Sequence, residues 1–194
     1  MEGWIDYIET IAGGLRGMVV TDRRREELSP LEGVTRWVAM TRATHERGRY
    51  LYIVGNGGSA GMASHMAADA CKNGHLRALS FTDAALVTAT ANDLSYDQVF
   101  SLPIERLAQA GDLLITISSS GNSPNIVRAL ETSRPLGLEA VTLSAMSPDN
   151  RSRTLGDLNF YVPLNRYGLA ESAHQAILHY WFDQYLHVHR QGAV

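Results

Sequence analysis

The sequence has few of the features that mark secreted, membrane or nucleic-acid-binding proteins. Cys71 is its one cysteine, so no intramolecular disulfide framework can form. Lys and Arg number 17 against 20 Asp and Glu, a formal net charge of -3, so no basic field attracts nucleic acid. No apolar run approaches the length of a membrane span, and acids stand near the N-terminus where a secretory leader carries Lys or Arg. We expect a cytoplasmic protein that binds neither nucleic acid nor membranes.

The 194 residues contain no internal repeat, linker or low-complexity segment, so a single domain is expected. Apolar residues recur at helical spacing over residues 3–20, although Gly13-Gly14 weakens that helix, and again over residues 29–47. These helices expose apolar positions that a lone α/β domain would not cover. We therefore assign residues 1–47 to oligomerisation and residues 48–194 to an α/β core.

The core region alternates short apolar strands with helices, a pattern that predicts a parallel, doubly wound sheet. The expected strands are 50–54, 78–81, 113–118, 140–143 and 160–163. The expected helices are 60–73, 84–91, 96–108, 124–134 and 171–187. Ligands bind beyond the carboxyl ends of the strands in such sheets, so the segments that follow the strands should form one cleft.

Two short loops rich in small polar residues carry the strongest functional signal. Residues 55–59 read Gly-Asn-Gly-Gly-Ser and residues 118–123 read Ser-Ser-Ser-Gly-Asn-Ser, each between an expected strand and an expected helix. Small residues let a ligand approach the backbone, and the N–H groups at the helix start then point at an anion. An ordinary Ser-rich turn is the alternative, but a helix cap rarely needs so many hydroxyl and amide groups. Finding the arrangement twice predicts a small phosphorylated substrate.

Neither loop matches a familiar nucleotide-binding motif. A Walker A loop needs a lysine before its Ser or Thr, and neither loop has one. The dinucleotide fingerprint needs a glycine at position 60, which is Ala60 here. A nucleotide cofactor is therefore not expected.

Histidines and carboxylates lie on the helix after the first loop and on the last helix. His65 and Asp69 share a helix face and suit a divalent metal or acid–base chemistry, although an ordinary surface pair has the same spacing. Glu171 and His179 lie eight residues apart, about 12 Å along a straight helix. One ion can receive both only if the helix bends or neighbouring subunits share the site. Gln175 with His179 is a competing same-face pair.

These motifs resemble the sugar isomerase (SIS) domain family, in its phosphoheptose isomerase branch. The resemblance rests on the first loop with His65 six residues after Ser59, on residues 88–93 and 97–101, and on the run 111–125. It covers nearly the whole chain. It implies a flavodoxin-like, five-stranded SIS domain in a homotetramer with sites at subunit interfaces. It also implies an aldose–ketose isomerase that converts sedoheptulose 7-phosphate to D-glycero-D-manno-heptose 7-phosphate through an enediolate.

The resemblance also implies roles for individual residues. The substrate phosphate would be held by Ser118, Ser119, Ser120 and Ser123. The sugar chain would be held by Asn56, Gly57, Gly58, Ser59, Asn92, Asp93 and Glu171. A divalent metal, usually zinc in the family, would be held by His65, Asp69, Glu171 and His179. Asp69 would act as the base and His179 as the acid, while the metal polarises the carbonyl.

The chain departs from the family pattern at four positions. Asp69 stands where the family has Glu, and Glu171 stands where it has Gln. Gly168 and Leu169 replace an Asp and an Arg. The metal set therefore carries one extra negative charge, which suits zinc and could also suit manganese or iron. Two alternatives stay open: an isomerase of another phosphosugar, and a non-catalytic sensor or adaptor. A purely structural oligomerisation domain would leave both loops unexplained.

Overall fold

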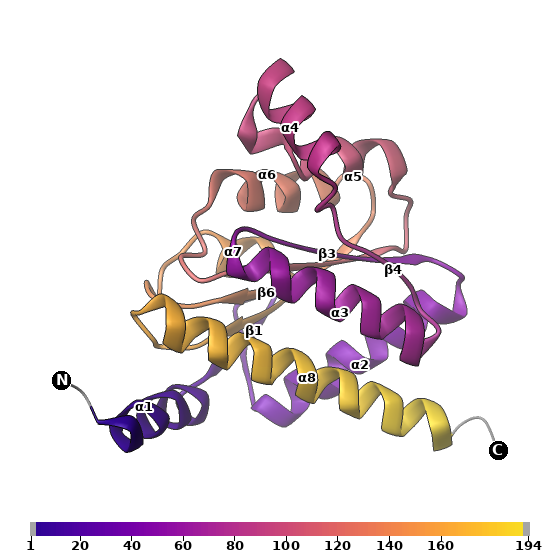
Figure 1. Ribbon diagram of the computed structural model, residues 1–194. Coiled ribbons are helices and arrows are strands. Elements are labelled where there is room, and N and C mark those ends of the chain that lie inside the picture. Colours follow the sequence, from indigo (N-terminus) through magenta and orange to yellow (C-terminus); the bar gives the residue numbers. More distant parts are fainter. Residues whose placement is uncertain (1–2, 192–194) are drawn as a thin grey trace.

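The strands of this chain are short runs of apolar and β-branched residues, which suit strands buried on both faces. The computed structural model describes residues 3–191, with side chains as far as His189, and its strands form one seven-stranded sheet (Figure 1). In chain order they are β1 (Val19–Asp22), β2 (Glu27–Leu28), β3 (Tyr50–Gly55), β4 (Arg77–Leu79), β5 (Leu113–Ser118), β6 (Glu139–Ser144) and β7 (Leu158–Tyr161). Their order across the sheet is β2-β1-β7-β6-β5-β3-β4.

Helices cover both faces of the sheet, with α4, α5 and α6 on one side and α1, α2, α3 and α8 on the other (Figure 1). They are α1 (Trp4–Arg16), α2 (Pro30–Glu46), α3 (Gly58–Gly74), α4 (Ala84–Asp93), α5 (Ser101–Leu107), α6 (Pro124–Ser133), α7 (Ser152–Leu155) and α8 (Tyr167–Gln191), with the 3-10 turn η1 (Tyr96–Gln98). In this described part of the chain, no helix has both the length and the apolar character that a membrane span needs.

The five strands expected from the sequence form the parallel part of the sheet. They lie in the order β4-β3-β5-β6-β7, which is the flavodoxin-like order 2-1-3-4-5. This confirms the expected fold class. The order reverses between β3 and β5, and the helices that follow these two strands, α3 and α6, leave toward opposite faces. A ligand crevice is expected at that switch point.

The N-terminal expectation of one helix over residues 3–20 is wrong over its last four residues. Helix α1 ends at Arg16, and the next residues form the hairpin β1–β2, which pairs antiparallel with β7. Val19 and Val20 are β-branched and align with Tyr161 and Phe160. Their apolar spacing suits either a helix or a strand. Pairing with β7 is what makes this segment a strand. The hairpin extends the expected five-stranded sheet to seven strands.

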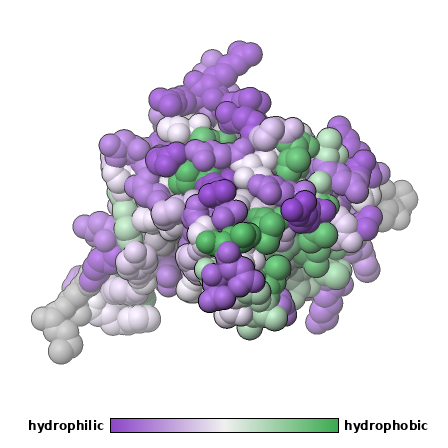
Figure 2. Space-filling view, turned by 90° about the horizontal axis from the view of Figure 1, so that it is seen from above, coloured by the Kyte–Doolittle hydropathy of each residue, from purple (hydrophilic) through white to green (hydrophobic). Residues whose placement is uncertain are grey.

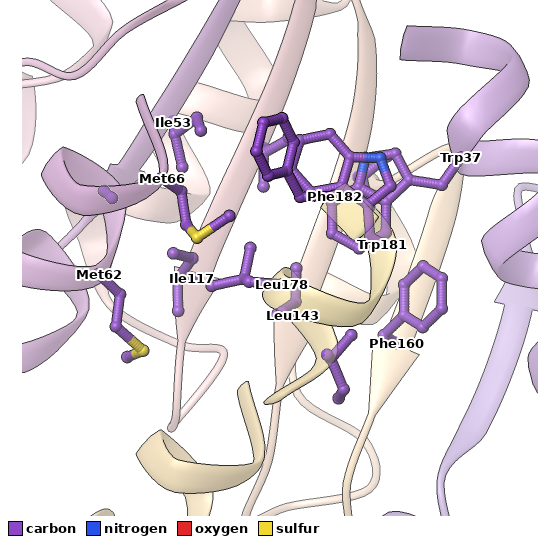
Figure 3. Close-up of a cluster of buried hydrophobic side chains, with 14 of the residues drawn as sticks. Trp37, Ile53, Met62, Met66, Ile117, Leu143, Phe160, Leu178, Trp181 and Phe182 are labelled. Atoms are coloured by element: carbon purple, nitrogen blue, oxygen red, sulfur yellow. The ribbon is translucent and has the colours of Figure 1, made fainter. Parts of the chain in front are cut away.

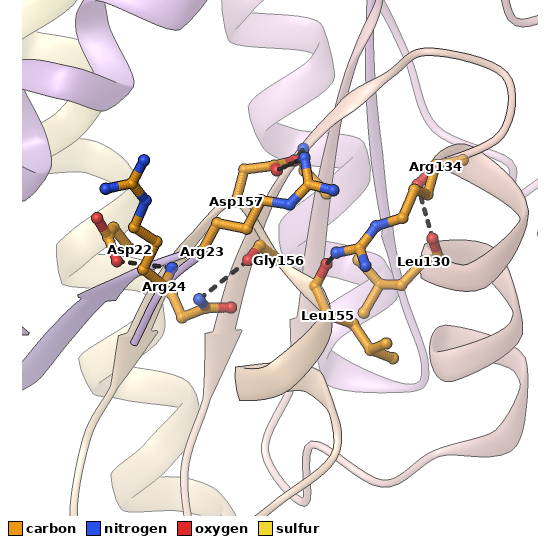
Figure 4. Close-up of polar contacts among 11 residues, drawn as sticks. Asp22, Arg23, Arg24, Leu130, Arg134, Leu155, Gly156 and Asp157 are labelled. Carbon is orange, nitrogen blue, oxygen red and sulfur yellow. Dashed lines mark hydrogen bonds and ion pairs between the residues drawn. The ribbon is translucent and has the colours of Figure 1, made fainter. Parts of the chain in front are cut away.

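The hairpin is held in place by polar contacts at its turn (Figure 4). The Asp22 carboxylate accepts hydrogen bonds from the backbone N–H groups of Arg24, at 2.8 Å, and Glu26, at 3.0 Å. Arg23 reaches the Asp157 carboxylate at 3.5 Å, immediately before β7.

Three smaller differences from the expected elements appear in the helices. The expected helix 96–108 is divided into η1 and α5, the short helix α7 was not expected, and α8 begins four residues early.

The larger of the two cores lies under the sheet, where α2 and α8 meet (Figure 3). Trp37 of α2 stacks on Trp181 of α8 with ring centroids 4.5 Å apart, and Phe160 of β7 lies 5.2 Å from Trp37. The Trp181 indole N–H is buried and donates to the Thr41 hydroxyl at 3.1 Å. These contacts fix α8, which carries residues of the expected site, against the sheet and α2.

The two glycines of α1 have different surroundings. A Cβ on Gly14 would lie 2.5 Å from the buried side chain of Leu164, whereas a Cβ on Gly13 would meet nothing within 4 Å. The absence of a side chain at position 14 therefore lets α1 approach the segment between β7 and α8. Gly13 has only the ordinary conformational cost of glycine in a helix.

These neighbours provide a matched test of α1 docking. We expect Gly14→Ala to lower the free energy of unfolding by about 1–3 kcal/mol, because the methyl group displaces packed atoms. Gly13→Ala should raise it by about 0.5–1 kcal/mol through helix propensity. Urea denaturation of both variants measures the two changes, and equal effects would contradict the docking of α1 seen here.

Candidate active site

A cavity of about 110 Å³ opens at the carboxyl ends of β3 and β5, where the strand order reverses. It is lined by Asn56, Ser59, Ile117, Ser118, Ser119, Ser120, Ser123, Tyr167 and Glu171. Both polar loops and Glu171 therefore contact one space. The rule that ligands bind beyond the carboxyl ends of parallel strands correctly located this cleft. Tyr167 was not singled out, although it lies in the segment that follows the last strand.

The second loop is shaped by its own polar groups. The Ser118 hydroxyl accepts the N–H of Gly121 at 3.2 Å and lies 3.3 Å from the Ser123 hydroxyl. Gly121 has φ +62°, and a Cβ there would overlap the Asn150 amide, so only glycine fits. The Ser119 hydroxyl is buried without a hydrogen-bond partner among the described residues. A ligand oxygen would satisfy it, as buried polar groups require.

The first loop brings a carboxylate to the start of α3. Gly57, the N-cap residue, has φ +54° and ψ -122°, a conformation open to glycine alone. A Cβ on the next residue, Gly58, would lie 2.8 Å from both carboxylate oxygens of Glu171. The Glu171 carboxylate therefore lies against the first turn of α3, where the helix dipole favours negative charge.

The lining of the cavity is rich in side-chain hydroxyl groups and contains one carboxylate. Its lining contains no lysine, arginine or histidine among the described residues, so backbone N–H groups and serine hydroxyls must hold a negative group. The Glu171 carboxylate can only accept hydrogen bonds when ionised, and ligand hydroxyls can donate them. A molecule with a phosphate at one end and hydroxyls along its chain matches both requirements.

His65, Asp69 and His179 meet further along the same two helices. The His65 Nε2 lies 3.2 Å from an Asp69 carboxylate oxygen, and the His65 and His179 rings are 5.4 Å apart between centroids. Glu171 is not with them: it lies against Gly58, seven residues before His65 and so about 10 Å away along α3. No group of three or more His, Cys, Asp or Glu in residues 3–189 is placed to hold a metal ion. One chain thus divides the four expected ligands between two places.

Two further expectations concern Gln175 and the departures from the family pattern. The Gln175 amide contacts the sulfur of Met66 at 3.7 Å, so it turns toward α3. Leu169 is buried in the core, and a Cβ on Gly168 would lie 3.0 Å from the Tyr7 hydroxyl of α1. Of the two positions where the family has Asp and Arg, position 169 is therefore part of the core, and position 168 is an exposed glycine beside Tyr7.

Asn92 and Asp93 lie at the exposed C-terminal end of α4, where their side chains bond to each other at 2.8 Å. They line neither the cavity above nor its neighbour, so their role in holding the sugar chain stays a prediction.

The neighbouring cavity, of about 300 Å³, shares Asn56 and is largely apolar, with Phe81 and Phe100 in its lining. Viewed from the α4 side, the surface shows apolar areas among polar groups (Figure 2).

His174 is the one histidine of α8 that is completely buried. Neither ring nitrogen has a partner within hydrogen-bond geometry among the described residues. Burial lowers its pKa to about 4, and the backbone of Ser144 offsets only part of that effect. The ring is therefore neutral in the folded protein at physiological pH, and it acts as a packing group one turn from Glu171.

The buried ring makes stability depend on pH. The pKa of His174 is lower in the folded state than the value of about 6.5 in the unfolded chain, so only the unfolded chain takes up a proton as the pH falls below that value. We expect this residue to remove about 2 kcal/mol of stability between pH 7 and pH 5. Unfolding free energies of wild type and His174→Gln across that range measure it. Equal pH slopes would contradict the neutral, buried ring.

Comparisons with known proteins agree with this geometry. Residues 19–145 match the family model described as SIS domain. A phosphoheptose isomerase of Nitratidesulfovibrio vulgaris is 37% identical over 142 residues, which is 70% of this chain and 68% of that protein. The phosphoheptose isomerase of Pelobacter propionicus is 39% identical over 140 residues, covering 69% and 73% of the two chains.

Solved structures show the same fold. The phosphoheptose isomerase GmhA from Neisseria gonorrhoeae superposes with a TM-score of 0.81 at 25% identity, covering 94% of each chain. A phosphoheptose isomerase from Francisella tularensis gives a TM-score of 0.79 at 22% identity, over 92% of this chain and 94% of that one. With the sequence relatives, they show that this chain belongs to the SIS domain family and, within it, to the phosphoheptose isomerases.

Proposed function

We propose that this enzyme is an aldose–ketose isomerase that converts sedoheptulose 7-phosphate to D-glycero-D-manno-heptose 7-phosphate. The observation that carries the proposal is the cavity in which both polar loops and Glu171 meet. The loops offer donors for the phosphate, and the carboxylate offers an acceptor for sugar hydroxyls. Relatives named phosphoheptose isomerase support the same substrate.

The reaction moves one proton between C1 and C2 and a second proton between their oxygens. We assign the carbon-bound proton to Asp69: its carboxylate removes the proton from C1 of the ketose, which leaves the enediolate, and returns it to C2. His179 exchanges the second proton between O2 and O1. The contact of His65 with Asp69, at 3.2 Å, holds the carboxylate in place.

The distance between these groups supports a shared site. Asp69 lies eleven residues beyond Gly58, which corresponds to about 16 Å along α3. The six carbon–carbon bonds of a heptose, each about 1.5 Å, cannot span that distance from a phosphate bound in the cavity of the same chain. In our proposal one subunit holds the phosphate, and a neighbouring subunit supplies the acid–base pair.

An apolar surface is available for such a neighbour. A groove of about 520 Å³ runs between α1, α2 and α8 and is lined by Leu15, Met18, Pro30, Leu31, Val34, Ala176, Ile177 and Tyr180. Trp4 and Ile5 of α1 are also largely exposed. A second copy of the chain would bury these side chains, which supports the expected homotetramer.

The single cysteine supports the cytoplasmic location expected above.

A divalent metal belongs to the same proposal. His65, Asp69 and His179 are donor types that zinc prefers, and manganese or iron is the alternative. They do not form a complete site in the described residues of one chain. In our proposal a neighbouring subunit's Glu171 completes the set. When bound, such an ion would polarise the sugar oxygens.

The acid–base assignment is tested by replacing one carboxylate. We expect Asp69→Asn to lower kcat for sedoheptulose 7-phosphate by about 100-fold or more, because general base catalysis contributes about that much. Substrate binding, measured by calorimetry, should be retained. Asp183→Asn, an exposed carboxylate on α8, is the matched control and should leave turnover unchanged.

Several outcomes would contradict the assignment. Full turnover by Asp69→Asn would remove Asp69 as the base. If the wild-type enzyme turns over only other phosphosugars in a panel of coupled assays, sedoheptulose 7-phosphate is not its substrate. A wild type that turns over none of them would favour the sensor or adaptor alternative. Metal content of the untagged protein, with turnover before and after chelation, decides the metal separately.

The shared site predicts that assembly and activity fall together. Leu31 is 67% exposed in the α1–α2–α8 groove, and we expect Leu31→Glu to dissociate the oligomer and abolish turnover. Leu107→Glu, at a leucine 54% exposed on α5, controls for surface charge and should do neither. Light scattering after gel filtration, with turnover assayed on the same fractions, measures both. An active monomer would overturn the shared site.

A further inference from the structure

The side chains of Asn56, Asn125 and Tyr96 form a hydrogen-bonded group between the two loops, here called the amide latch. The Asn56 Nδ2 donates to the Asn125 Oδ1 at 2.9 Å, and the Asn125 Nδ2 donates back to the Asn56 Oδ1 at 2.8 Å. The Tyr96 hydroxyl donates to the same Asn56 oxygen at 3.1 Å. The two amides therefore form a closed pair with the tyrosine bound to one side.

A backbone group fixes the orientation of the pair. The N–H of Ile126 lies 3.0 Å from the Asn125 Oδ1, and a backbone N–H can only donate. The side-chain atom of Asn125 that faces this N–H must therefore be the oxygen Oδ1. The nitrogen Nδ2 is then the atom of Asn125 that donates to Asn56. One Nδ2 hydrogen of Asn56 stays available to a ligand, because the latch uses only the other.

The latch joins the two helix starts that border the anion cavity. Asn56 directly precedes the N-cap of α3, and Asn125 is the second residue of α6, although they lie 69 positions apart in the chain. Because α3 and α6 diverge to opposite faces of the sheet, their N-termini converge only at this point. Asn56 lines the cavity, whereas Asn125 is 2% exposed and does not.

The turn η1 supports the latch from the side of the apolar cavity. Tyr96 lines that cavity and bonds Asn56, which lines both cavities. The next residue, Asp97, accepts a hydrogen bond from Arg128 of α6 at 2.7 Å. The turn η1 is thus tied to α6 through Asp97 and to the first loop through Tyr96.

We propose that the amide latch holds the N-termini of α3 and α6 in the relative position needed to bind one phosphate group between them. Asn125 and Tyr96 are then positioning residues of the reaction, acting through Asn56 and the loop backbones. The inference rests on the proposed function for its substrate, but the anion site can be tested with inorganic phosphate alone. Loss of the latch should weaken binding of the phosphate end more than it slows the chemical step.

A double-mutant cycle on the full-length enzyme tests this. We expect Asn125→Ala to weaken inorganic phosphate binding about 10-fold and to raise KM for sedoheptulose 7-phosphate more than it lowers kcat. Tyr96→Phe should weaken phosphate binding about 3-fold, because the amide pair persists. In the Asn125→Ala background, Tyr96→Phe should have no further effect, since the hydroxyl acts through the pair. Titration calorimetry with phosphate measures all four corners.

Tyr50→Phe is the matched control, because the Tyr50 hydroxyl bonds Arg77 near the amino end of β3, away from the latch. The phosphate affinity of this variant should equal that of wild type. Unchanged phosphate affinity in Asn125→Ala, or effects that multiply independently in the double variant, would overturn the latch. Where Asn125→Ala does not fold, Asn125→Asp keeps the shape, removes the donor and completes the same cycle. A wild type that binds phosphate without isomerising sedoheptulose 7-phosphate overturns the proposed substrate only. A wild type that binds no phosphate overturns both.

Discussion

The constraint on which this structure depends is the need to satisfy the free N–H groups of two helices that begin side by side. The first turn of a helix has donors without intrahelical partners, and α3 and α6 both begin where the strand order reverses between β3 and β5. Positive φ angles at Gly57 and Gly121 turn the chain tightly enough to bring these donors to one cavity. Because no basic side chain lines the described cavity, the anion binding proposed above relies on the helix-start N–H groups rather than on a counter-charge.

The candidate binding groups and the candidate acid–base groups lie at different places along α3 and α8. At one end, the Glu171 carboxylate lies against Gly58 beside the serine loop, and toward the other end Asp69 meets His65. In the function proposed above, this separation along the two helices favours a site shared between two copies of the chain. The exposed apolar groove between α1, α2 and α8 is the surface on which the proposed neighbouring subunit would pack.

The departures from the family pattern receive different physical explanations. Leu169 belongs to the core, and Gly168 makes room for the Tyr7 hydroxyl where α1 packs on α8. The Glu171 carboxylate instead faces the cavity, where it changes the hydrogen-bond acceptors offered to the ligand. Of these three residues, Glu171 is therefore the one that lines the cavity.

Much of the fold and part of the site were predictable from the sequence. The parallel strands, the two loops and their common cleft follow from local patterns, because apolar runs, glycine turns and strand ends are read within a few residues. The strand Val19–Asp22 was missed because its apolar spacing also suits a helix, and only pairing with β7 decides. The sequence by itself determined which residues reach the carboxyl edge of the sheet. Only the tertiary structure decided that Glu171 lies against Gly58 and that Asn56 bonds Asn125, since these contacts join segments far apart in the chain.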